Sequence, residues 1–75
     1  MDRIEYVNKR EKALRFIYNN RNRDISTFLN SNDESFLEEF AHMGFIDIDK
    51  TTNTYHITQL GKEYIEEFYN YSKLK

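Results

Sequence analysis

A chain of 75 residues makes one small domain, which buries only about 60% of the surface that its unfolded form exposes. We therefore expect a single domain over residues 1–75 without a large enclosed active-site cavity. Hydrophobic residues make up 39% of the chain and aromatic residues 16%, which favours a packed core over disorder despite 32% charged residues.

Cysteine is absent, which excludes disulfides and thiolate metal sites. The first residues contain no apolar run that resembles a signal peptide, and no uninterrupted apolar segment approaches membrane-spanning length. The sequence therefore predicts a cytoplasmic protein that does not associate with membranes.

The net charge of −2 conceals a strong asymmetry along the chain. Residues 1–23 contain seven Lys or Arg and three carboxylates, a net charge of +4, whereas residues 24–75 contain four Lys and ten carboxylates, a net charge of −6. A basic first segment thus precedes an acidic body, so any affinity for nucleic acid is expected from the first segment.

A first helix is predicted over about residues 3–19, because its apolar positions fall within one arc at 100° per residue. These positions are Ile4, Tyr6, Val7, Ala13, Leu14, Ile17 and Tyr18. Arg10 falls in the middle of the arc. Either its guanidinium is paired at the edge of the core, which we favour, or the helix starts later and the first residues form an arm.

The segment 19–23 is polar and is predicted to form a turn. Asp24 or Ser26 can then cap a short second helix, whose apolar residues are Ile25, Phe28 and Leu29. After a second turn at 30–33, a third helix is predicted from about Glu34 to Met43.

In the second half of the chain, a glycine and a threonine indicate where helices end and begin. Gly44 lies where a helix end takes a positive φ, which costs least without a Cβ atom. The segments 46–49 and 54–57 alternate apolar and polar residues, so they are predicted to form a hairpin around loop 50–53. Thr58 can cap a last helix through its hydroxyl. That helix has an apolar stripe formed by Leu60, Tyr64, Ile65, Phe68 and Tyr71.

From about Ile25 to Ile65 the chain resembles winged helix-turn-helix transcription regulators of the broad MarR and PadR kind. The segments that carry the resemblance are FLEEFAHMGFI at 36–46 and ITQLGKEYI at 57–65. The resemblance implies a mainly α fold with a small β-hairpin (α+β), in the order helix, helix, helix, hairpin, helix. It also implies a transcription-related regulator without enzymatic activity, whose third helix enters the major groove of double-stranded DNA.

The exposed face of the third helix departs from that pattern, because it carries carboxylates where a recognition helix usually carries Arg, Lys, Asn or Gln. The helical wheel predicts that this face contains Glu34, Ser35, Glu38, Glu39 and His42. Three interpretations stay open: the carboxylates are solvated charges, they form an acidic docking face for a basic protein partner, or they read base edges.

Cations that could contact the DNA backbone lie mainly in the first segment. They are Lys9, Lys12, Arg15, Arg21, Arg23 and, in the loop of the hairpin, Lys50. Pairing of Glu5 with Lys9 or of Glu11 with Arg15 would partly neutralise them, and a solvated helix face is the alternative interpretation.

Catalysis has little support, since the two histidines are accompanied by no nucleophile with a base and an orienting group. His42 and Glu38 lie one helical turn apart, but two ligands alone usually bind metal adventitiously, so neither a metal nor a cofactor is expected. Tyr64 and Phe68 are expected in the core. Tyr69 and Tyr71 exceed what a small core covers and are predicted to form a homodimer surface.

Overall fold

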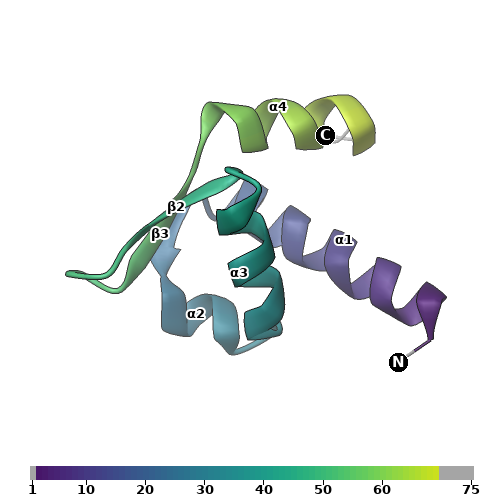
Figure 1. The fold of residues 1–75 in the computed structure, drawn as a ribbon, viewed down its shortest axis with the longest axis horizontal. Helices are drawn as coiled ribbons and strands as arrows, with labels where there is room; N and C mark the ends of the chain where they lie inside the picture. The colour runs from purple at the N-terminus through teal and green to yellow at the C-terminus, as the bar shows by residue number, and fades with distance from the viewer. Residues whose placement is uncertain (1, 70–75) are drawn as a thin grey trace.

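The computed structural model of the chain describes residues 2–69, with the side chain of Tyr69 left out. Helices and strands follow in the order α1 (Arg3–Asn19), β1 (Asn22–Asp24), α2 (Ile25–Leu29), α3 (Glu34–His42), β2 (Ile46–Asp49), β3 (Thr54–Ile57) and α4 (Gln59–Tyr69). The fold is therefore mainly helical with a small antiparallel sheet, as the sequence predicts (Figure 1).

Strand β1 corrects the sequence prediction, which placed a turn at 19–23. Its three residues are exposed and polar, so no apolar alternation marks them as a strand. They pair in antiparallel register with β3, Arg23 opposite Tyr55, and complete a sheet in the order β1-β3-β2. Backbone hydrogen bonds continue at both ends, from Ile57 N to Arg21 O and from Ile25 N to Asn53 O.

The core lies between α1, the α2–α3 pair, the sheet and α4. Its fully buried large side chains are Tyr18, Tyr55, Phe28, Phe40, Leu14, Ile17, Ile46 and Ile65. Edge-to-face ring contacts connect Phe28 to Phe16 and to Tyr55, which joins α2 to α1 and to β3. The Tyr55 hydroxyl donates to Asn20 O at 2.7 Å, so this buried polar group is satisfied.

The junction between α3, β2 and α4 contains the predicted helix end and the predicted helix cap. Gly44 takes φ +82°, as expected at the helix end. The Thr58 hydroxyl accepts from Gly61 N at 3.0 Å, which caps α4, and it donates to Gly44 O at 2.6 Å. A Cβ atom on Gly61 would overlap the backbone of Phe45, so glycine is required for this close approach.

Two predicted apolar stripes extend beyond the core. In α1, Ala13, Leu14, Ile17 and Tyr18 are buried, but Ile4 and Val7 are exposed because the first turns extend to the edge of the fold (Figure 1). Tyr6 is 42% exposed, although its ring lies 5.6 Å from the Phe36 ring of α3. In α4 the core contains Ile65 and, in part, Tyr64, whereas Phe68 is 66% exposed and Leu60 is 55% exposed. The prediction that Phe68 belongs to the core was wrong.

Smaller corrections concern helix ends. Asp24 occupies the N-cap position of α2, but its side chain makes no capping hydrogen bond. Asp33 caps α3 by accepting from Ser35 N at 2.8 Å. This bond to the backbone lowers the pKa of the Asp33 carboxyl, with a smaller contribution from the charge of Lys9. Helix α3 ends at His42, one residue earlier than predicted, and Met43 is its C-cap.

Candidate nucleic-acid and protein interfaces

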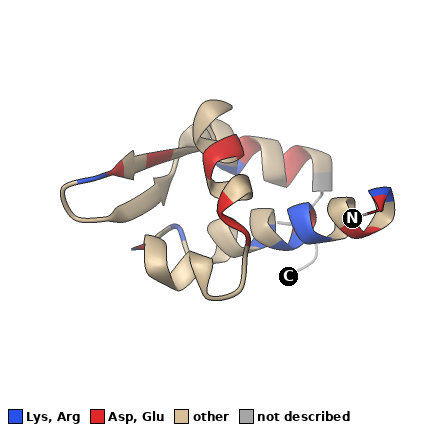
Figure 2. Ribbon diagram, turned by 60° about the horizontal axis from the view of Figure 1, so that its bottom comes forward, with Lys and Arg blue, Asp and Glu red and all other residues tan. Residues whose placement is uncertain are grey.

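The outward side of α3 is acidic, as the helical wheel predicts. Glu34, Ser35, Glu38 and His42 are exposed on it, opposite the buried Phe36, Leu37 and Phe40. None of these exposed side chains of α3 is a Lys or Arg, and Figure 2 shows acidic residues along this helix. The face can accept hydrogen bonds and attract cations, but it repels phosphate rows.

Glu39 differs from the other carboxylates of α3, because it turns toward α1. Arg10 Nε donates to it at 2.6 Å and the Tyr6 hydroxyl donates to it at 3.1 Å. The side chains of Arg10 and Glu39 are only 17% and 29% exposed. Glu39 is thus withdrawn from the predicted exposed face, and it joins two helices instead.

Arg10 confirms the favoured interpretation of its place in the α1 arc, with its guanidinium paired at the edge of the core. The guanidinium lies 5.7 Å from the centre of the Phe40 ring, and its Nη2 lies 3.7 Å from Met43 Sδ. Burial opposes its charge, but hydrogen bonds to Glu39 and Tyr64 outweigh burial and raise the Arg10 pKa. The bond to Glu39 also raises the pKa of the Tyr6 phenol.

The basic side of α1 is present, but its cations already have partners. Lys9 Nζ pairs with Glu5 at 3.1 Å, and an Arg15 nitrogen lies 3.6 Å from Glu11, as the spacing predicts. Both cations remain about half exposed, at 51% and 52%. Such exposed pairs exchange readily with water, so these cations can be redirected to phosphates at little cost.

Lys12 places the basic side of α1 next to the turn between α2 and α3. Its Nζ donates to Ser31 O at 3.2 Å. A pocket of about 360 Å³ lies at this junction, lined by Lys9, Lys12, Leu29, Phe36 and residues 30–33. Sequence reasoning did not bring these elements together, because the contact joins residues nineteen positions apart.

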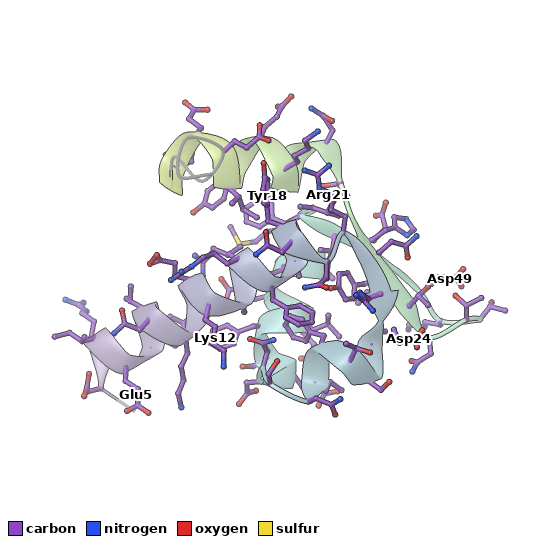
Figure 3. The ribbon with its side chains drawn as sticks, turned by 180° about the vertical axis from the view of Figure 1, so that it is seen from behind. Glu5, Lys12, Tyr18, Arg21, Asp24 and Asp49 are labelled. Carbon is purple, nitrogen blue, oxygen red and sulfur yellow. The ribbon has the colours of Figure 1, made fainter. Side chains whose placement is uncertain are left out.

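The remaining predicted cations lie in a second region, at the sheet. Arg21 lies 5.1 Å from the Tyr18 ring centre and donates to Tyr18 O, and Arg23 donates to Asn20 Oδ1. Figure 3 labels Tyr18 and Arg21 side by side near α4. Lys50 lies in the hairpin loop, which projects away from α1 (Figure 2). The six predicted cations therefore do not form one patch.

Metal ligation, membrane-spanning helices and the predicted dimer residues remain to be considered. Among residues 2–69, no three His, Asp or Glu side chains are arranged to hold a metal ion. In the same part of the chain, no helix combines the length and the apolar character needed to cross a bilayer. Tyr71 and the side chain of Tyr69, the predicted dimer residues, lie outside what the structure describes.

Comparison of the chain with protein-family models, with curated proteins and with solved structures found no match. The resemblance to winged-helix regulators therefore depends on the sequence pattern.

Proposed function

We propose that this chain is a winged helix-turn-helix module of a transcription-related regulator that associates with double-stranded DNA and has no catalytic role. One observation supports the proposal: an α2–α3 pair joined by a tight turn packs beside a β1-β3-β2 sheet, from which the loop 50–53, the proposed wing, projects (Figure 1). Fold alone does not determine function, so the charged surfaces must supply the rest of the argument.

The contact to DNA is assigned to the phosphate backbone rather than to base edges. Lys9 and Lys12 lie against the α2–α3 turn, whose residues Asn30, Ser31 and Asn32 offer further hydrogen-bonding groups. Serine, asparagine and lysine side chains are common partners of phosphate oxygens. The carboxylates of α3 oppose deep entry into the groove, so we expect weak, salt-dependent and poorly sequence-specific binding.

Fluorescence anisotropy with a labelled 20-base-pair duplex tests the proposal. The dissociation constant should rise steeply between about 50 and 200 mM salt, because bound phosphates release counterions. The combined variant Lys9→Glu, Lys12→Glu and Arg15→Glu should abolish binding. The variant Lys62→Glu is the matched control for each reversal made singly, since this lysine lies on α4, and it should bind nearly as the unmodified chain does.

Substitution of the α3 carboxylates gives a second test, in which the expected effect on DNA affinity is opposite to that of the basic reversals. Glu38→Gln should leave binding unchanged or tighten it, because it removes repulsion from the phosphates. If Glu38→Gln instead destroyed sequence-selective binding while the basic reversals had no effect, α3 would read cytosine edges and the backbone assignment would be wrong.

A protein-docking module is the second candidate, and a specific observation favours it. Glu34, Glu38 and His42 are exposed on α3, whereas the Lys9 and Arg15 cations are already paired within the chain. If no duplex binding is measurable at about 50 mM salt, where electrostatic association is favoured, a basic protein partner replaces DNA. Glu34→Gln with Glu38→Gln should then weaken that association.

A further inference from the structure

The side chain of Met43, the C-cap residue of α3, places a thioether beside the guanidinium of Arg10. Arg10 Nη2 lies 3.7 Å from Met43 Sδ, and sulfur is only a weak hydrogen-bond acceptor. Met43 is 42% exposed, so solutes in water reach its side chain. The chain has no cysteine and two methionines, Met1 and Met43. Within residues 2–69, sulfur chemistry is therefore confined to this position.

Contacts that do not involve the sulfur hold Arg10 in place. Its Nε donates to Glu39 at 2.6 Å, and its guanidinium lies 5.7 Å from the centre of the Phe40 ring. The side chain of Arg10 is only 17% exposed. Because Nε rather than Nη2 bonds to Glu39, Nη2 can donate to a stronger acceptor without breaking the pair that joins α1 to α3. A charged donor is thus held next to a weak acceptor.

Oxidation by a peroxide changes the sulfur into a strong acceptor. The sulfur lone pair attacks one oxygen of hydrogen peroxide, so an S–O bond forms as the O–O bond breaks. Sulfur is oxidised by two electrons to the sulfoxide, and the peroxide is reduced to water. A sulfoxide in an apolar core disrupts packing, but Met43 lies at the surface and the new oxygen forms within reach of the Arg10 cation. Hydrogen bonds from charged donors are the strong ones.

We infer that Met43 is a site of reversible oxidation by peroxides, and that Arg10 Nη2 donates to the sulfoxide oxygen, which tightens the contact between α1 and α3. The reverse step is reduction by a methionine sulfoxide reductase, in which two thiols supply the electrons and end as a disulfide, with water as the other product. Oxidation therefore leaves the fold intact and strengthens one contact between helices. The inference does not rest on DNA binding.

Urea unfolding before and after treatment with hydrogen peroxide tests the inference. Mass spectrometry of proteolytic peptides should find one added oxygen on Met43. The equilibrium constant for unfolding should then fall about three- to tenfold, because the sulfoxide gains a charged donor. In the combined variant Arg10→Leu with Glu39→Gln, which removes the donor without leaving the carboxylate unpaired, oxidation should produce no such fall.

Two controls separate the effect at Met43 from general oxidation. Met43→Leu conserves the side-chain volume and retains Met1, so peroxide should leave the unfolding constant of this variant unchanged. A methionine sulfoxide reductase with a thiol should return the oxidised unmodified chain to its original stability. Nuclear magnetic resonance supplies a readout that needs no variant: the Nη protons of Arg10 should exchange with water more slowly in the oxidised chain.

Three results would overturn the inference. One is a Met43 that stays unoxidised in peroxide that oxidises free methionine. Another is an unfolding constant that does not fall on oxidation, or that falls equally in the combined variant. The third is unaltered exchange of the Arg10 Nη protons, since the sulfoxide oxygen would then have a partner other than Arg10.

Discussion

The pair formed by Arg10 and Glu39 should be the most stabilising ion pair among the described residues. It connects α1 to α3 across 29 positions of sequence, at 2.6 Å from Nε to the carboxylate. The informative perturbation is a double-mutant cycle with Arg10→Met and Glu39→Gln, because methionine and glutamine retain most of the packing volume while removing the charges.

The expected coupling energy follows from geometry and exposure. A hydrogen bond to a charged group contributes about 1.5–3 kcal/mol to stability. Exposures of 17% and 29% leave both side chains in partial contact with water, which reduces this value. We therefore expect a coupling of about 1–2 kcal/mol, and a domain of this size loses roughly 4–8 °C of melting temperature for each kcal/mol.

Urea unfolding followed by circular dichroism measures the four free energies of the cycle. The pair of Lys9 with Glu5 is the matched control, since it lies on α1 alone and both side chains are 51% exposed. Its coupling should be about 0.3–0.5 kcal/mol. A coupling for Arg10 with Glu39 no larger than this control would refute the conclusion that the pair fixes α3 against α1.

Two further predictions concern close packing and titration. Gly61→Ala should cost on the order of 2 kcal/mol, because its Cβ atom meets the backbone of Phe45, whereas Gly44→Ala should cost about 1 kcal/mol through its positive φ; equal melting temperatures for the two variants would contradict this order. Burial raises the pKa of Tyr55 from 10.0 to about 12. The neutral phenol is thus favoured in the folded state. The resulting contribution of Tyr55 to the free energy of unfolding is constant below pH 10 and is lost as the pH rises toward 12. Tyr55→Phe should remove this loss, although it also removes the hydrogen bond to Asn20 O; an unchanged slope of stability against pH would show that Tyr55 is not its source.

Local chemistry made much of the fold predictable. The positive φ of Gly44 and the capping hydroxyl of Thr58 each follow from the residue type at one position. Hairpin strands with alternating apolar residues are equally visible, because one face of each strand is buried. These signals lie within a few residues of the feature they specify.

Strand β1 could not be predicted in this way. Its side chains are exposed and polar, so its place in the sheet depends on backbone pairing with β3, more than thirty residues later. The exposure of Phe68 and Val7 has a related cause: the apolar periodicity of a helix continues without regard to where the neighbouring elements end. Periodicity predicts which side of a helix is apolar, but the tertiary structure determines how much of that side is covered.

The candidate interface on α3 could also be predicted only in part, because one of its residues contacts an element distant in sequence. The helical wheel predicted that the outward side of α3 is acidic, but it could not separate Glu39 from Glu38, its neighbour in sequence. Only the packing of α1 across α3 brings Arg10 to Glu39 and leaves Glu38 open. Because one carboxylate is neutralised within the fold, the surface available to a partner is narrower than the helical wheel predicts. A substitution at Glu39 therefore tests stability, whereas substitutions at Glu38 and Glu34 test binding. Experiments that treat the three glutamates as one cluster would confuse these two effects.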